Sequence, residues 1–281
     1  MPLNELKALL ALGTLLTGAL GGLAPLFWAR PSSQQGGSRR LVGAGNAFAA
    51  GLFLGIGLLH FLPEGSASYA SLGVLYPVAS VLALGAFLLL LLLEHVLLPD
   101  AAHDAAHAHS GEGHSSHHHH PPASHDSATG RQSTSAYILL LALSIHSVLA
   151  GTVLGADNDA MGVLMTFLAI AVHKGAAGLA LGLALATNAS VTRVRAFKLV
   201  SLFALMTPLG ILVGSLAGAA LRSDARLFFD ATAAALAAGT FLYIGAFDLV
   251  QDEFLRAGRR WTKWVCAVVG AALAAFLAGW L

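Results

Sequence analysis

Long apolar runs separated by short polar connections make up most of the chain. Eight of these runs reach the length of about 20 apolar residues that a membrane-spanning helix requires. The eight runs cover residues 3–28, 41–63, 73–98, 135–156, 160–187, 196–221, 228–250 and 262–280. Because the runs are continuous rather than short and alternating, they predict helices and not the strands of an outer-membrane barrel. The pattern therefore predicts an all-α integral membrane protein with eight transmembrane helices in a bundle.

The composition agrees with this prediction and limits the chemistry. The chain has 281 residues, of which 57% are hydrophobic and only 10% are charged, whereas a soluble domain carries about 25% charged residues. Cys266 is the only cysteine, so cysteine-based zinc sites and disulfides within the chain are excluded. The first run is too long for the apolar region of a signal peptide and lacks a preceding basic segment, so we expect no cleavable signal. We expect a multi-pass protein of the plasma (inner) membrane, with no nucleic-acid partner.

Basic residues predict the orientation of the helices. The loops after the first, third, fifth and seventh runs hold eleven lysines and arginines, and the opposite side holds three. The eleven are Arg30, Arg39, Arg40, Arg131, Arg193, Arg195, Lys198, Arg256, Arg259, Arg260 and Lys263, and the three are Lys7, Arg222 and Arg226. Since basic loops stay on the cytoplasmic side, we expect both termini outside.

One long connection, residues 99–134, interrupts the series of apolar runs. It holds nine of the thirteen histidines of the chain. Such a composition cannot bury a core, so we expect this cytoplasmic loop to be disordered. Neutral imidazole is a common ligand of Zn²⁺-like cations, so the loop either buffers or senses metal ions or is an inert spacer. The predicted organisation is one membrane domain, with helices one to three in 1–98 and helices four to eight in 135–281.

Two histidines occupy the same place in a motif repeated on the fourth and fifth runs. The segments HSVLAGTVLG, from His146, and HKGAAGLALG, from His173, both match H-x-x-x-A-G-x-x-L-G. Consecutive helices run antiparallel and both histidines lie near the middle of their runs, so we expect the two rings to share one cation. The alternative is two unrelated core histidines, each hydrogen-bonded to a nearby carbonyl or serine.

Small residues follow each of these histidines. Gly151 and Gly155 on the fourth run, and Gly178 and Gly182 on the fifth, have the spacing that lets two helix backbones approach closely. We expect these faces to bring the fourth and fifth helices together, and with them the two imidazoles. Small-residue faces are also compatible with a homodimer.

Further polar groups lie in or near the ends of other runs. His60 and Glu64 are four residues apart and share a helix face, next to Pro63, which we expect to bend or open that end. They indicate an outer access site for a divalent cation or, alternatively, an ordinary membrane-interface pair. At the cytoplasmic end, an exit relay or a plain interfacial position is indicated for Glu94, His95, Asp248 and Asp252. The segment MTPLG in the sixth run predicts a kink that either lines a substrate site or serves packing.

Five segments together resemble the ZIP family of divalent-metal transporters. They resemble the family's second, fourth, fifth, sixth and seventh helices and read, in this order, GLFLGIGLLHFLPEG, LALSIHSVLAGTVLGA, VHKGAAGLALGLAL, SLFALMTPLGILVG and AGTFLYIGAFDLVQDEF. The HS and HK forms of the motif resemble the subfamily that includes plant iron/zinc transporters and several animal zinc importers. The resemblance implies import of Zn²⁺ or Fe²⁺ toward the cytoplasm between helices four and five. It implies that His146 and His173 are ligands and that Ser147 lines the metal path, with the metal as cargo and no prosthetic group.

The chain departs from the family pattern at three positions. Where many members carry a carboxylate four residues after each histidine, this chain has Ala150 and Ala177, and Lys174 stands at a position that is often acidic. A two-cation site needs carboxylates to offset its charge, so we infer a single-ion site in which Lys174 takes the space or charge of a second cation. Imidazole ligands favour Zn²⁺, Fe²⁺, Co²⁺ or Ni²⁺ over Mg²⁺ and Ca²⁺.

Two other classes of function remain as alternatives. The missing carboxylates are compatible with a non-transporting metal sensor or scaffold of the same fold, with the His-rich loop as its reader. An intramembrane zinc hydrolase would need three protein ligands, a water and usually a carboxylate base. No carboxylate lies within one turn of His146 or His173, so we expect that the protein is not an enzyme.

Overall fold

A computed structural model describes residues 2–29, 37–97, 126–188, 190–217, 223–255 and 259–279. The regular structure in these ranges is helical throughout, with no strand. The α-helices are α1 (Leu3–Trp28), α2 (Gly37–Ile56), α3 (Leu62–Ser71), α4 (Val78–Leu92), α6 (Asp126–Ala156), α7 (Ala160–Thr187), α8 (Arg193–Ala217), α9 (Ser223–Tyr243), α10 (Asp252–Leu255) and α11 (Arg260–Ala278). Three π-helical segments interrupt or extend them: η1 (Gly57–Phe61), η2 (Leu93–Leu97) and η3 (Ile244–Gln251). Eight stretches are long and apolar enough to cross a membrane, which confirms the predicted all-α fold with eight spans.

Two boundaries differ most from the prediction. The second span does not end at Pro63 but runs from Arg40 to Ser71. Pro63 stands in the first turn of α3, where a missing N–H is tolerated, and the preceding turn widens so that the Leu62 N–H bonds to the Gly57 carbonyl. The prediction that Pro63 opens this end of the helix is therefore wrong, whereas a bend at Pro63 stays a prediction. The predicted loop 99–134 is also shortened, because α6 begins at Asp126; its residues 99–125 lie outside the described part of the chain.

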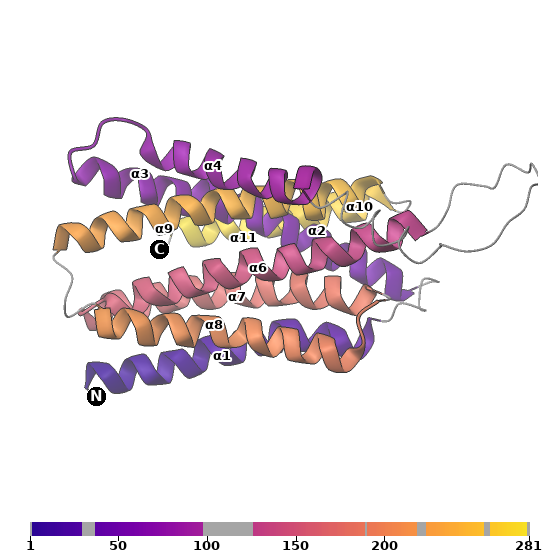
Figure 1. Cartoon of the computed structure of the whole chain (residues 1–281), viewed down its shortest axis with the longest axis horizontal. Helices are drawn as coiled ribbons and strands as arrows, with labels where there is room; N and C mark the ends of the chain where they lie inside the picture. Colours follow the sequence, from indigo (N-terminus) through magenta and orange to yellow (C-terminus); the bar gives the residue numbers. More distant parts are fainter. Residues whose placement is uncertain are drawn as a thin grey trace, which may run out of the picture.

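The helices form two groups that lie side by side (Figure 1). In the first bundle α1 packs against α7 and α8, and α6 packs against α8. In the second bundle α11 packs against α2, and α9 packs against α3 and α4. The two bundles meet where α2 and α9 contact α7 and α6. Residues on α6 and α7 therefore lie at the boundary between the bundles.

Close helix packing depends on the predicted glycines, but with other partners than expected. A Cβ atom at Gly155 would collide with the Ile211 carbonyl oxygen of α8, and one at Gly182 would collide with the Gly22 carbonyl oxygen of α1. The glycine faces thus hold α6 against α8 and α7 against α1, so the expectation that they join α6 to α7 is wrong. Because these faces are covered within the chain, they give no reason to expect a homodimer.

The segment around Pro208 belongs to a continuous helix. Pro208 lies inside α8, which runs without interruption from Arg193 to Ala217. A Cβ atom at Gly210 would meet the Val148 carbonyl oxygen of α6, so the small residue serves close packing. The structure therefore supports the packing alternative for MTPLG rather than a broken helix that lines a site.

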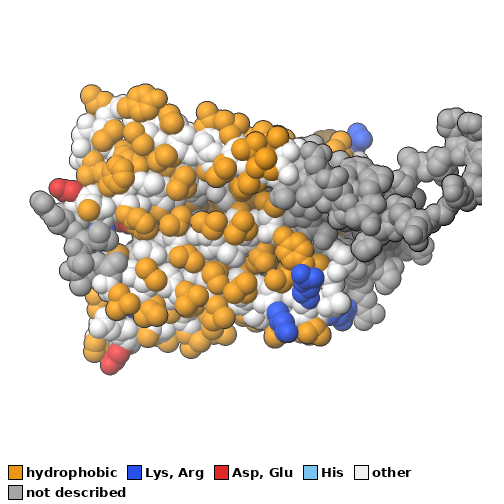
Figure 2. Space-filling model, in the orientation of Figure 1, with side chains coloured by type: hydrophobic (Ala, Val, Ile, Leu, Met, Phe, Trp, Pro, Cys, Tyr) orange, Lys and Arg blue, Asp and Glu red, His pale blue; other side chains and the backbone are white. Residues whose placement is uncertain are grey.

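The surface of the protein matches a membrane environment. Apolar side chains cover the sides of the bundle, whereas the lysine and arginine side chains visible in Figure 2 gather at its right-hand end. Arg193, Arg195 and Lys198, at the start of α8, are exposed. Both chain termini lie toward the left-hand end in Figure 1, as an even number of spans requires. This separation of charge is the pattern from which the orientation was predicted.

Candidate metal site

The structure brings the two motif histidines together. His146 of α6 and His173 of α7 face each other with their Nε2 atoms 3.4 Å apart, and both residues are buried. His146 lies ten residues before the end of α6, and His173 lies thirteen residues after the start of α7. At about 1.5 Å per residue, both rings are about 15–20 Å inside the end of the bundle where the two helices connect.

The geometry of this pair matches that of two ligands on one ion. Nitrogen ligands about 2.0–2.1 Å from a tetrahedral zinc ion lie about 3.3–3.4 Å from each other. The Nδ1 atom of His146 is buried and has no hydrogen-bond partner among the described residues. Such an orphaned polar atom is uncommon in a core that serves packing alone.

Aromatic rings enclose the histidine pair. The Phe61 ring lies 5.4 Å from each imidazole, and the Phe241 ring lies 4.6 Å from that of His146 and 5.8 Å from that of His173, measured between centroids. Phe61 belongs to η1 and Phe241 to α9, so the second bundle supplies an apolar wall against histidines of the first. Sequence reasoning missed both residues, because one phenylalanine in an apolar run carries no distinguishing pattern.

Lys174 extends into the first bundle, toward α1 and α8. The residue is only 2% exposed. The ammonium group donates to Ser147 Oγ and to the Phe203 carbonyl oxygen, both at 3.2 Å, and lies 4.0 Å from the centre of the Phe203 ring. These partners compensate the burial of a charged group in the membrane. The hydrogen bond from Lys174 also engages the hydroxyl of Ser147, the residue predicted to line the metal path.

A cavity of about 160 Å³ extends from the histidine pair toward the connection between α6 and α7, which is enough for several waters or a hydrated cation. His60, Glu64 and Asp230 contribute polar groups to its wall, and Ala150, one turn after His146, also lines it. His60 Nε2 lies 3.7 Å from Glu64 Oε2, and the Glu64 side chain is half exposed.

The other predicted site residues fall elsewhere. Ala177 is buried in the apolar core and does not line the cavity. Near the opposite end, the Tyr243 hydroxyl donates to Glu94 Oε2 at 2.9 Å and lies 3.1 Å from His95 Nδ1. Asp248 and Asp252 belong to η3 and α10, but their side chains lie outside the described part of the structure. The π-helical segments, which occur preferentially at functional sites, contain four of the predicted site residues: His60, Glu94, His95 and Asp248.

Asp230 is the carboxylate that the sequence reasoning overlooked. It is the third residue of the predicted run 228–250, so its position near a run end resembles an ordinary interfacial acid. Only the cavity shows that it faces the same space as His60 and His146. Among the described residues, no group of three or more histidine, cysteine, aspartate or glutamate side chains is placed to hold a metal ion. The histidine pair and the cavity acids are therefore separate groups along one path.

The fold and the site define a multi-pass helical membrane protein with a histidine pair at the inner end of a cavity between two bundles. The model of the family described as ZIP Zinc transporter matches residues 99–278. Zinc transporter ZIP2 of Homo sapiens is 28% identical, over 98% of this chain and 97% of its own length. Zinc transporter ZIP1 of Homo sapiens is 30% identical over 87% of this chain and 81% of its own length, and Fe(2+) transport protein 2 of Arabidopsis thaliana is 26% identical over 89% and 78%. The chain belongs to the ZIP family.

Proposed function

We propose that the protein imports divalent transition-metal cations, Zn²⁺ first and Fe²⁺ second, toward the cytoplasm through a single-ion site formed by His146 and His173. One observation carries this proposal: two buried imidazole nitrogens from neighbouring helices lie 3.4 Å apart at the end of a cavity. Family membership supports transport over the alternative of a metal sensor, and the named activities of the relatives, zinc and Fe(2+) transport, support the choice of ions.

The ligand types support selectivity for transition metals. Imidazole nitrogen binds Zn²⁺, Fe²⁺, Co²⁺ and Ni²⁺ well, whereas Mg²⁺ and Ca²⁺ prefer sites made of oxygen ligands. Two imidazoles leave coordination positions for water, so the ion is held loosely enough to leave. Lys174 adds a positive charge near this site without a carboxylate to balance it, because Ala150 stands where a carboxylate would line the cavity. We infer that this arrangement limits the site to one ion and favours its release.

The polar groups along the path support an inward direction. His60 and Glu64 act at the outer access site, where negative charge attracts the cation, and the neutral histidine pair receives it deeper in the membrane. Glu94 and His95, with Asp248 and Asp252, act as an exit relay at the other end. The excess of basic residues in the loops on that side supports outside termini and a cytoplasmic exit. We place the protein in the plasma (inner) membrane.

Uptake into proteoliposomes tests the proposal. The purified protein should accumulate Zn²⁺ and, more weakly, Fe²⁺, and should not accumulate Mg²⁺ or Ca²⁺. His173→Ala should abolish uptake while the protein remains folded, because one imidazole alone cannot hold the ion. Uptake of the variant at the wild-type rate would remove the assignment of the site, and no uptake by the wild-type protein would remove the proposed function.

A second experiment separates transport from sensing by the His-rich loop. Deleting residues 101–125 stops short of α6, so the deletion leaves the described helices intact. If the loop only buffers metal, basal uptake continues at a rate close to that of the full chain. Complete loss of uptake in a folded deletion variant would show that the loop, and not the intramembrane path alone, carries the activity.

A further inference from the structure

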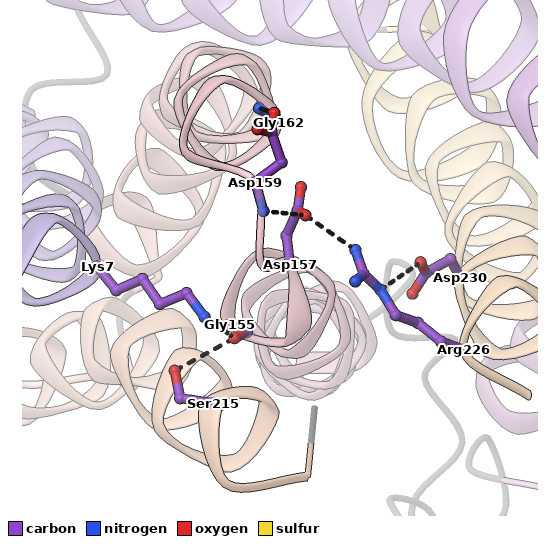
Figure 3. A network of polar contacts seen from close by, with 8 residues as sticks. All are labelled: Lys7, Gly155, Asp157, Asp159, Gly162, Ser215, Arg226 and Asp230. Atoms are coloured by element: carbon purple, nitrogen blue, oxygen red, sulfur yellow. Dashed lines mark hydrogen bonds and ion pairs between the residues drawn. The ribbon is translucent and has the colours of Figure 1, made fainter. Parts of the chain in front are cut away.

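Arg226 of α9 lies between two carboxylates at the outer end of the cavity. Its Nη2 atom is 3.1 Å from Asp157 Oδ1, and its Nε atom is 3.7 Å from Asp230 Oδ2 (Figure 3). Asp157 lies in the connection between α6 and α7 of the first bundle, whereas Arg226 and Asp230 belong to α9 of the second. The pair Arg226–Asp157 therefore connects the two bundles beside the mouth of the metal path.

Asp157 is well compensated without Arg226. Its Oδ1 atom accepts a hydrogen bond from the Asp159 backbone N–H at 3.1 Å. The carboxylate also lies against the first turn of α7, where a Cβ atom at Gly162 would collide with Asp157 Oδ2. The N-terminus of a helix carries partial positive charge that stabilises an anion. A backbone donor and a helix end thus hold this carboxylate in place.

Asp230 is poorly compensated by comparison. Its closest ionic partner, Arg226, is at the longer of the two distances. Its Oδ1 atom is buried and has no hydrogen-bond partner among the described residues. The residue also lines the cavity that holds His60, Glu64 and the histidine pair. A buried carboxylate oxygen without a partner is costly unless a cation or water reaches it.

We propose that Asp230 is a cation-binding residue of the outer cavity, and that Arg226 is its exchangeable counterion. A divalent cation in the cavity attracts the Asp230 carboxylate more strongly than the single charge of Arg226 does, and it repels the guanidinium. Arg226 then moves fully onto Asp157, to which it is already closer. The ion thus replaces Arg226 at Asp230, and no charge is left without a partner.

The exchange has a consequence for the two bundles. While the outer cavity is empty, the Arg226 guanidinium is paired both with Asp230 of its own helix and with Asp157 of the other bundle. When an ion occupies Asp230, the guanidinium pairs with Asp157 alone, and the contact between the bundles becomes stronger. Capture of a cation and closer association of the bundles at this end are therefore coupled through one side chain. This inference rests on the proposed function, because it assigns a further residue to the same cation path.

The kinetics of three variants test the exchange. Asp230→Asn removes the binding carboxylate and should raise the KM for Zn²⁺ about tenfold, with a smaller effect on the maximal rate, since the histidine pair is unchanged. Asp157→Asn releases Arg226 onto Asp230 and should also raise the KM. Arg226→Gln removes the competing cation and should lower the KM. Glu5→Gln is the matched control, because Glu5 is an exposed acid at the same end of the bundle and outside the cavity.

The signs of these effects separate binding from a structural role. A structural ion pair would make Arg226→Gln and Asp230→Asn change the KM in the same direction. That result, or a KM for Asp230→Asn within twofold of the wild-type value, would overturn the proposal. Equilibrium binding of Zn²⁺ to the full chain in detergent provides a second measurement, in which Asp230→Asn should bind one ion fewer or bind it more weakly than the wild-type protein. If the wild-type protein shows no uptake, the proposed function fails, and the binding difference still decides the role of Asp230.

Discussion

Replacing Ala150 by aspartate places a carboxylate next to the histidine pair. Ala150 lies one helical turn after His146 and lines the cavity, so a side chain at this position shares the face of the ligand. A charged oxygen ligand contributes at least as much as a hydrogen bond to a charged group, about 1.5–3 kcal/mol. This free energy corresponds to an affinity about 10–150-fold higher. We therefore expect Ala150→Asp to lower the KM for Zn²⁺ by at least about tenfold, and to lower the maximal rate because the ion leaves more slowly.

Zinc uptake into proteoliposomes, measured over a range of Zn²⁺ concentrations, checks this prediction. Ala150→Asn is the first control, since it has almost the same size but no charge and should change the KM little. Ala177→Asp is the second, because Ala177 occupies the equivalent motif position but lies in the apolar core. We expect this variant to fold poorly rather than to bind more tightly. A KM for folded Ala150→Asp equal to that of Ala150→Asn would refute the position of the ion beside His146.

Two further predictions concern charge and packing. Lys174→Met replaces the buried ammonium by an apolar chain of similar length and should lower the KM for Zn²⁺ by removing repulsion of the ion; an unchanged KM, measured by the same uptake assay, would show that Lys174 does not affect the site. Gly155→Val should lower the melting temperature of the purified protein, because the valine side chain collides with the backbone of α8. Gly85→Val is the control and should not lower it, since nothing lies within 4 Å of a Cβ atom at that position. Equal melting temperatures for the two variants would contradict the close approach of α6 and α8.

The sequence predicted the features that repeat along the chain. Eight apolar runs predicted eight spans, because the membrane requires long apolar helices whatever their packing partners. The histidine motifs identified His146 and His173 as neighbours, since helices joined by a three-residue connection must lie antiparallel and adjacent. These predictions depend only on the spacing of residues along the chain and on how far a residue lies from the ends of its apolar run.

The sequence could not predict which helix surfaces meet. Gly155 and Gly182 have the spacing of close-packing residues, but spacing does not name the partner, and the partners are Ile211 of α8 and Gly22 of α1. The position of Asp230 beside the cavity could not be predicted for the same reason. Its neighbours along the chain give no indication that it faces a cavity shared with residues about 60–170 positions away. The sequence predicts a helix end at Pro63, whereas the helix continues past it, with a π-helical turn just before the proline.

X-ray absorption spectroscopy of zinc-loaded protein shows whether His146 and His173 bind one metal ion together. The variant lacking residues 101–125 should be used with one equivalent of Zn²⁺, so that histidines of the loop do not compete. We expect two imidazole nitrogens about 2.0–2.1 Å from the metal, and their loss in the double variant His146→Ala/His173→Ala. A spectrum without imidazole ligands, or one that the double substitution leaves unchanged, would contradict a metal ion held between α6 and α7.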